Sequence, residues 1–322
     1  MKRRDFLLAA GALAAPLGAR AQAKGVPRVG VILYSDAYAP VVEGLRAGLK
    51  ALGAVEGRHF VIDTRDGKGD VKAIEAAARA FERERAALIY SVPTSATTVV
   101  MRATTEIPVV FCVGTDPIAT GFVQSYAKPG GRLTGVHYLT VDLTPKRLEL
   151  LKDLLPKLAR VVTFYNPHNP AAQLSARSAR EAAKKLGVQL IERHVRSQAE
   201  VRAALGALRP GEADAIFFVA DVLPTVHFEI FIERAKAIRM PTMVFDVNLA
   251  ERGALVSYGV NLREVGRQSA NHVQRVLAGA RPGVLPVENV THLTFALNRR
   301  TAKEIGVAVP PAMIVSFDRV IE

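Results

Sequence analysis

The chain has 322 residues, of which 49% are hydrophobic, so it can bury a large core and is expected to form two domains. The formal net charge of +13 is spread along the chain, and we find no helix-turn-helix, zinc-finger or basic-aromatic pattern, which argues against a nucleic-acid partner. Cys112 is the only cysteine, so neither a disulfide nor a thiolate metal site can form within one chain.

The first 23 residues have the pattern of an export signal. A basic start at residues 2–4 is followed by an apolar run at 6–17 and by the small-x-small site Ala21-Gln22-Ala23. The stretch Arg3-Arg4-Asp5-Phe6-Leu7 also matches the twin-arginine pattern. The apolar run is shorter than the roughly 20 residues that a membrane span needs. We therefore predict a signal peptide that is cleaved near Ala23 and a mature protein in the periplasm.

From residue 26 the first half of the chain alternates between strand and helix patterns. Short apolar runs predict strands at 28–34, 60–64, 87–91 and 107–113. Amphipathic spacing predicts helices at 40–52 and 70–86, and a short one that ends near residue 104. Strands that alternate with helices at this interval imply a parallel sheet with helices on both faces.

A second series of the same kind follows. Strands are expected at 160–165, 188–194, 215–219, 241–245 and 255–258, and helices at 144–155, 171–186, 199–208 and 224–238. In both halves a Leu-Gly pair, at 52–53 and 186–187, ends a helix just before a strand. This echo predicts two similar α/β lobes.

Small polar residues follow the apolar strands at their carboxyl ends, where parallel sheets bind ligands. They are Ser35, Thr94, Ser95, Thr115, Asp116, Asn166, Asp221 and Asp246. Hydroxyl groups and helix-start N–H groups suit an anion, whereas carboxylates suit an ammonium or hydroxyl groups. Each residue alone could instead cap the next helix, which is the commoner role of a motif such as Asp116-Pro117. Together they predict a ligand site in the crevice between the two lobes.

Signatures of enzymes are absent from the sequence. It contains no dinucleotide-binding or phosphate-binding glycine motif, no nucleophile elbow and no H-E-x-x-H, and its seven histidines lack metal-ligand spacing. We expect no cofactor, no metal and no catalytic residue. Asp221 and Asp246 could still pair as acid and base. Four tyrosines lie near strand ends, where they either stack on a ligand or simply pack: Tyr34, Tyr38, Tyr138 and Tyr165.

Several motifs carry a resemblance to a known family. They are Asp116-Pro117-x-x-x-Gly121, Lys128-Pro129-Gly130-Gly131-x-x-Thr134-Gly135-Val136, Tyr165-Asn166-Pro167-x-Asn169-Pro170, Ser257-Tyr258-Gly259 and Pro286-Val287-Glu288. With them the chain resembles the substrate-binding proteins of one ABC-transporter family, which includes tryptophan- and phenylalanine-binding members and is similar to type I periplasmic binding proteins. The match covers essentially the whole mature chain. One departure is Arg132, where the family usually has Asn.

The resemblance implies a fold of two Rossmann-like lobes with parallel sheets and three interlobe crossovers, near Tyr138, Asn261 and Val290. The N-terminal lobe would comprise residues 24–138 and 262–290, including a helix at 263–277. The C-terminal lobe would comprise residues 139–261 and 291–322.

The resemblance also implies a function: a monomeric periplasmic solute-binding protein that passes a small ligand to the membrane permease of an ABC importer. The ligand would be an amino acid, with the aromatic amino acids as the narrower expectation. Thr94, Ser95, Thr115 and Asp116 would hold its carboxylate or neighbouring polar atoms. Its ammonium would meet Asp221 or Asp246, and its side chain would lie against Tyr34 or Tyr165. Ser35 and Asn166 complete the predicted site.

Three alternatives remain open at this point. The ligand could be a carboxylate or aromatic acid that lacks an amine. The chain could be an exported α/β enzyme that uses Asp221 or Asp246. It could also be a binding protein that serves a sensor kinase instead of a permease.

Overall fold

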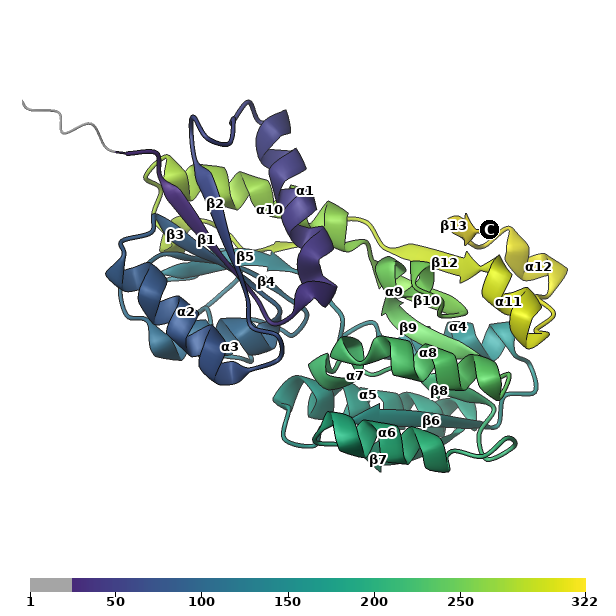
Figure 1. The fold of residues 1–322 in the computed structure, drawn as a ribbon. Helices are drawn as coiled ribbons and strands as arrows, with labels where there is room; N and C mark the ends of the chain where they lie inside the picture. Colours follow the sequence, from purple (N-terminus) through teal and green to yellow (C-terminus); the bar gives the residue numbers. More distant parts are fainter. Residues whose placement is uncertain (1–24) are drawn as a thin grey trace, which may run out of the picture.

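Two separate sheets organise residues 25–322, the part of the chain that this computed structural model describes (Figure 1). One sheet has six strands in the order β11-β5-β4-β3-β1-β2, and the other has seven in the order β13-β12-β10-β9-β8-β6-β7. Helices cover both faces of each sheet, so the prediction of a two-lobe α/β fold is confirmed. The predicted signal peptide of residues 1–23 lies outside the described residues.

The strands of the first lobe are all parallel to their neighbours. They are β1 (Arg28–Leu33), β2 (Val61–Asp66), β3 (Leu88–Val92), β4 (Val109–Val113), β5 (Leu133–His137) and β11 (Glu288–Asn289). The helices are η1 (Asp36–Tyr38), α1 (Ala39–Ala51), α2 (Val71–Arg83), α3 (Thr94–Ala103), α10 (Leu262–Leu277) and η2 (Pro282–Val284). Val29 and Val31 of β1 pack toward α1 and α10, whereas Ile32 packs toward α2 and α3, so apolar runs fill the core on both faces.

The second lobe contains the remaining elements. Its strands are β6 (Arg160–Tyr165), β7 (Gln189–His194), β8 (Ala215–Phe217), β9 (Thr242–Asp246), β10 (Val256–Val260), β12 (Thr294–Asn298) and β13 (Arg319–Ile321). Its helices are α4 (Thr144–Leu154), α5 (Pro170–Leu186), α6 (Gln198–Ala207), α7 (Val222–Val226), α8 (Phe228–Ala237), α9 (Val247–Glu251), α11 (Arg299–Ile305) and α12 (Pro311–Ile314).

Two features of this lobe differ from the sequence prediction. The helix expected at 224–238 is divided at His227 into α7 and α8. Strand β12 runs antiparallel to β10, so this sheet is mixed. The direction follows from the path of the chain: β10 ends at the side of the lobe from which the chain leaves, and β12 starts where the chain returns, so it must run back along its neighbour.

Three connections join the two sheets. They are residues 138–143 between β5 and α4, Asn261 between β10 and α10, and residues 290–293 between β11 and β12. The second connection is the single residue Asn261. Its side chain caps α10 by accepting a hydrogen bond from the Arg263 N–H at 2.9 Å. Three crossings agree with the predicted fold class.

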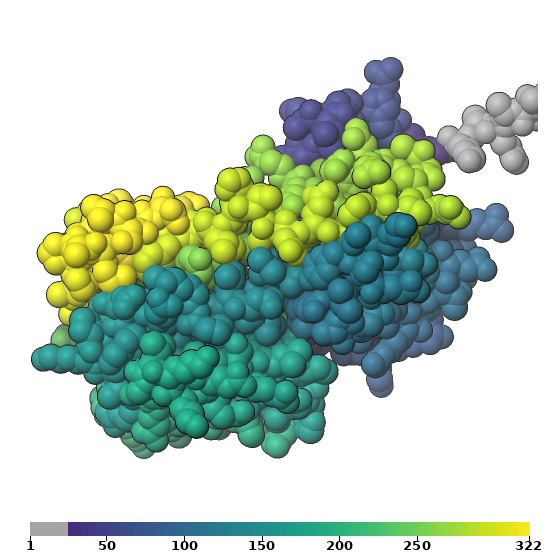
Figure 2. Space-filling model, turned by 180° about the vertical axis from the view of Figure 1, so that it is seen from behind, coloured from purple at the N-terminus to yellow at the C-terminus, as the bar shows by residue number. Residues whose placement is uncertain are grey.

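Close helix packing attaches α10 to the first lobe. A Cβ at Gly44 of α1 would lie 1.9 Å from the carbonyl oxygen of Arg263, and a Cβ at Gly266 of α10 would lie 1.9 Å from that of Val41. Only glycine therefore permits this approach of the two helices. Figure 2 shows the yellow-green residues after 260 lying over the purple and blue residues of the first lobe. Within residues 25–322, no helix combines the length and hydropathy of a membrane span.

Candidate functional site

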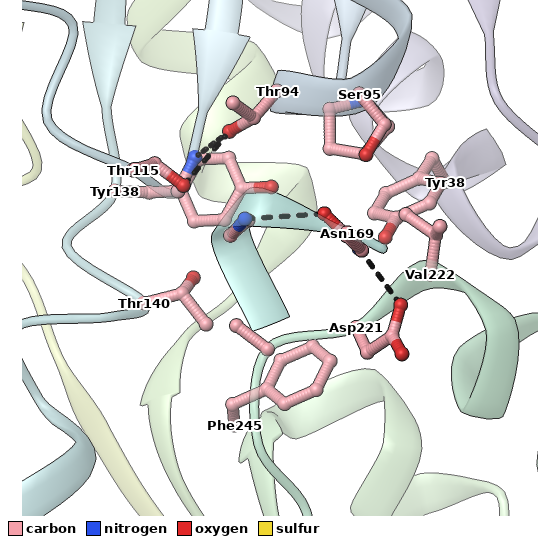
Figure 3. A pocket seen from close by; sticks show the side chains of 14 residues that line it. Tyr38, Thr94, Ser95, Thr115, Tyr138, Thr140, Asn169, Asp221, Val222 and Phe245 are labelled. Carbon is pink, nitrogen blue, oxygen red and sulfur yellow. Dashed lines mark hydrogen bonds between the residues drawn. The ribbon is translucent and has the colours of Figure 1, made fainter. Parts of the chain in front are cut away.

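A cavity lies between the lobes, where the carboxyl ends of strands from both sheets converge (Figure 3). It contains about 350 Å³ of space free of protein atoms, part of which is open solvent. The lining residues are Tyr38, Pro93, Thr94, Ser95, Gly114, Thr115, Tyr138, Thr140, Asn169, Ala171, Ala220, Asp221, Val222 and Phe245. The position agrees with the rule that ligands of open α/β sheets bind beyond the strand ends.

The first lobe contributes a wall of hydroxyl groups and the start of a helix. The Thr94 hydroxyl donates to Thr115 Oγ1 at 3.4 Å and accepts the Gly114 N–H at 3.2 Å. Helix α3 begins at Thr94, and the preceding Pro93 provides no side-chain cap. The first-turn N–H groups of α3 therefore lie at the cavity without such a cap, which suits an anionic group.

The first crossing adds two residues to this wall. Thr140 is 4% exposed, and its Oγ1 has no hydrogen-bond partner within residues 25–322. Tyr138 lies next to it, and Gly114 packs against both: a Cβ at position 114 would lie 2.8 Å from Thr140 Oγ1 and 2.8 Å from Tyr138 Cε2. The absence of a side chain at Gly114 thus leaves room for both residues at the cavity.

The second lobe contributes one carboxylate, that of Asp221. Asp221 caps α7 by accepting the Leu223 N–H at 3.3 Å, and it also accepts from Asn169 Nδ2 at 2.8 Å and from the Asn166 N–H. Burial raises the pKa of Asp221, although these hydrogen bonds oppose the rise. The dashed line in Figure 3 shows the contact that joins Asn169 and Asp221 at the cavity.

Aromatic rings supply the apolar surface. Tyr38 comes from η1 and Tyr138 from the first crossing, and Phe245 comes from the end of β9. The pKa of Tyr38 is raised by burial and by the charges of Asp246 and Asp221, so its phenol remains neutral. Rings on several sides, with polar groups at a few fixed points, are typical of sites for a flat apolar ligand.

Four of the ten predicted site residues line this cavity, namely Thr94, Ser95, Thr115 and Asp221. Tyr34 and Ser35 do not line the cavity, although they lie directly before η1, which contributes Tyr38. Burial and then the charges of Asp221 and Asp70 raise the pKa of Tyr34. Ser35 is 2% exposed, and its hydroxyl has no partner within the described part of the chain.

Three other predicted residues make hydrogen bonds away from the cavity, two of them within their own loops and one to a neighbouring strand. Asp116 Oδ1 accepts the Ile118 N–H at 2.9 Å, and Asn166 Oδ1 accepts the His168 N–H at 2.9 Å. The Tyr165 hydroxyl donates to Glu192 Oε2 at 2.7 Å, so its ring points toward β7. These local hydrogen bonds explain why the side chains are not directed into the cavity.

Asp246 also lies outside the cavity lining. It is 3% exposed and caps α9, because its Oδ1 accepts the Leu249 N–H at 2.9 Å. Burial raises its pKa to about 6. The residue before it, Phe245, is the one that lines the cavity.

The predicted site lacks several lining residues. Tyr38 and Tyr138 are among the tyrosines near strand ends that either stack or pack, and Thr140, Asn169 and Phe245 were not considered as contacts. Asn169 belongs to a motif that the resemblance had already used, and Tyr138 and Phe245 follow or end apolar strands, so those three carried a signal. Within residues 25–322, no group of three or more His, Cys, Asp or Glu side chains is placed to hold a metal ion.

Comparison with known proteins finds relatives both by sequence and by structure. A tyrosine-binding protein of Clostridioides difficile is 27% identical over 264 residues, which are 82% of this chain and 75% of that protein. The structure of a conserved domain protein from Vibrio cholerae matches with a TM-score of 0.85 at 27% identity and covers 92% of this chain and 99% of its own. An ABC domain in complex with L-Trp from Streptococcus pneumonia shares the fold, with a TM-score of 0.83 at 22% identity over 92% of this chain and 100% of its own.

The family match extends over nearly all of the described residues. Residues 28–321 match the family described as ABC transporter substrate binding protein. Members of this family bind a substrate without transforming it, in agreement with the absence of enzyme motifs from the sequence. The two-lobe cavity is the place where such a protein would hold a small molecule. The chain therefore belongs to the family of ABC transporter substrate binding proteins.

Proposed function

We propose that the protein is the periplasmic binding component of an ABC importer and that its ligand is an aromatic α-amino acid. The observation that carries this proposal is the composition of the cavity. An uncapped helix start with hydroxyl groups on one lobe faces a single carboxylate on the other, with aromatic rings between them. The tyrosine-binding and L-Trp-bound relatives support the same class of ligand.

The cavity suggests one orientation of the ligand. Its carboxylate would lie at the start of α3 against Thr94 and Ser95, and its ammonium would face Asp221. The ring would lie among Tyr38, Tyr138 and Phe245. Because these contacts come from both lobes, the ligand would stabilise the arrangement in which the lobes are together. That arrangement is the form that we propose the permease recognises.

A second candidate is an aromatic acid without an amine. Asp221 already accepts hydrogen bonds from three donors, and burial raises its pKa. A carboxylate that is partly satisfied in this way has less need of an ammonium partner.

A titration with L-tryptophan tests the proposal directly. The protein has no tryptophan, so any indole emission comes from the ligand alone. Calorimetry then compares L-tryptophan, L-tyrosine and L-phenylalanine with 3-(4-hydroxyphenyl)propionate and indole-3-propionate. We expect the deaminated analogues to bind about tenfold or more weakly, because an ion-paired hydrogen bond contributes about 1.5–3 kcal/mol. The reverse order would favour the amine-free acid, and binding of neither class would refute both candidates.

The location and partners form a separate proposal. We infer a mature monomer that begins near Lys24 and acts in the periplasm with a permease. The basic start, apolar run and Ala21-Gln22-Ala23 support this. N-terminal sequencing of protein from the periplasmic fraction checks the cleavage site. Retention of Met1 on cytosolic protein would contradict export, and genes for a sensor kinase next to this one, without a permease gene, would contradict the transport partner.

A further inference from the structure

A buried arginine lies beside the first crossing between the lobes. Arg147 of α4 is 0% exposed, and its Nη2 donates to the Thr140 carbonyl oxygen at 2.7 Å and to Thr144 Oγ1 at 2.9 Å. Its Nε and Nη1 have no hydrogen-bond partner among the described residues, and no carboxylate of residues 25–322 lies within ion-pair distance of it. Burial lowers its pKa to about 9, and the charges of Asp246 and Asp142 oppose the fall without a direct ion pair. Burying a charge without a direct ion pair costs free energy, so packing alone does not explain this residue.

The crossing that Arg147 contacts has an unfavourable backbone conformation. Leu139 has a φ of 56°, in the left-handed region that costs free energy for any residue with a Cβ. It stands between Tyr138 and Thr140, both of which line the cavity. A conformation of this kind persists only where the surrounding structure holds it in place.

Both lobes hold the crossing. On the side of the first lobe, the Tyr138 N–H donates to the Val113 carbonyl at 2.8 Å and the Val141 N–H donates to that of Gly114 at 3.2 Å. His137 Nε2 also lies 3.4 Å from Asp142 Oδ2. On the side of the second lobe, the Thr140 carbonyl accepts from Arg147 Nη2 at 2.7 Å and more weakly from the Thr144 hydroxyl at 3.4 Å. Hydrogen bonds from both lobes therefore hold the crossing, and the crossing in turn connects the two lobes.

We propose that Arg147 is a positioning residue for ligand binding. It holds the Thr140 carbonyl and with it the left-handed turn at Leu139, so that Tyr138 and Thr140 face the cavity. The link to affinity rests on the proposed function, whereas the effect on the crossing does not. Without Arg147 the crossing samples other conformations, and a ligand must then order it on binding, which lowers affinity.

Amide hydrogen exchange of the ligand-free protein tests the proposal without any ligand. The variant Arg147→Met keeps an unbranched side chain and removes the donors and the buried charge. We expect the amides of Tyr138 and Val141 to exchange about tenfold faster, while those of α5 and β6 keep their protection. Unchanged exchange at the crossing would overturn the proposal. Faster exchange throughout the second lobe would also overturn it, because Arg147 would then be a general core residue.

Two further variants make the test specific. Arg147→Lys retains a charged donor, so we expect it to restore part of the protection at Tyr138 and Val141, and it also serves if Arg147→Met does not fold. Arg132→Met is the matched control, because Arg132 also donates to backbone carbonyls, those of Ile107, Met101 and Thr104, but away from the crossing. This control should leave exchange at the crossing unchanged.

Binding of L-tryptophan supplies the second readout. We expect Arg147→Met to weaken it by about tenfold and Arg147→Lys to weaken it less. If the wild-type protein does not bind L-tryptophan, the proposed function fails, and amide exchange still decides the role of Arg147. If exchange at the crossing rises while affinity is unchanged, the crossing does not position the ligand and the proposal is wrong.

Discussion

The β8–α7 and β9–α9 turns of the second lobe have the same local design and different relations to the cavity. Each contains an aspartate that is 3% exposed and caps a helix of five residues, Asp221 in one and Asp246 in the other. Asp221 lines the cavity, whereas at the second turn Phe245 does so in place of the aspartate that follows it. Asp246 is the last residue of β9, where successive side chains point to opposite sides, so the cavity side goes to Phe245; Asp221 lies beyond the end of β8 and is free of this alternation. A polar residue at a strand end is therefore not in itself a ligand contact.

The two carboxylates also differ in how they are stabilised. Asp221 accepts from Asn166, Asn169 and Leu223. The hydrogen bonds of Asp246 come from the first turn of its own helix, at Leu249 and Asn248, and burial outweighs them, so its pKa is raised to about 6. We therefore expect Asp246 to affect stability and Asp221 to affect binding.

The largest expected effect is the pH dependence that Asp246 gives to stability. Its pKa rises from 3.8 in the unfolded chain to about 6 in the folded protein, so the folded state binds the proton more tightly and stability falls as pH rises between these values. Urea unfolding should show the free energy of unfolding of the wild type falling by up to about 3 kcal/mol relative to Asp246→Asn from about pH 4 to about pH 7. The asparagine keeps the helix cap but cannot titrate. Parallel pH profiles of the two proteins would contradict this prediction.

The next effect concerns the affinity for L-tryptophan. Asp221→Asn removes the proposed partner of the ligand's ammonium, so we expect binding to weaken by about tenfold to a hundredfold, which corresponds to about 1.5–3 kcal/mol. Asp246→Asn should change the affinity by less than about threefold, because Asp246 does not line the cavity. Calorimetry at neutral pH measures both, and melting curves check that both variants fold. An equal loss in the two variants would remove the distinction between the turns.

The smallest expected effect comes from the aromatic residue that replaces the aspartate at the second turn. Phe245→Leu keeps an apolar side chain but removes the ring, so L-tryptophan should bind up to about tenfold more weakly, in line with about 0.5–1.5 kcal/mol for an aromatic pair. The matched control is Phe231→Leu, in the core of the same lobe, where the ring packs on Phe164 at 5.3 Å between centroids. The control should lower the melting temperature and leave affinity unchanged. The opposite pattern would place Phe245 outside the binding site.

Local patterns were enough to predict most of the fold. Apolar runs such as 28–34 and 107–113 form β1 and β4, since strands buried on both faces need such runs. The direction of β12 depends on where the third crossing returns the chain, which no local pattern records. Local patterns did not predict the break at His227 either, because it depends on how α7 and α8 pack separately on the lobe.

The site was only partly predictable for a related reason. Thr94, Ser95, Thr115 and Asp221 follow the strand-end rule and line the cavity. Tyr38 and Thr140 lie in η1 and in the first crossing, which reach the cavity only through tertiary structure. Asp116 and Asn166 satisfy the same rule, but their side chains bond to their own loops. The rule predicts the position of the cavity better than which side chains line it.

Arg132, where the resemblance implies a departure from the family, has a clear structural role. Arg132 donates to the carbonyls of Ile107, Met101 and Thr104, which lie at the carboxyl end of α3 and just beyond it. The cavity lies at the other end of that helix, at Thr94. Arg132 therefore secures the loop between α3 and β4 and does not line the cavity.

The three crossings impose an order on synthesis. A ribosome completes strands β1 to β5 first, but α10 and β11, which belong to the same lobe, come only after the second lobe's strands β6 to β10 have been made. Until α10 emerges, the face of α1 that contains Gly44 and Leu45 has no partner helix to cover it. The lobe that begins first is thus completed late. A nascent chain that stops before residue 262 carries an incomplete first lobe, and the uncovered apolar face of α1 is then open to incorrect association.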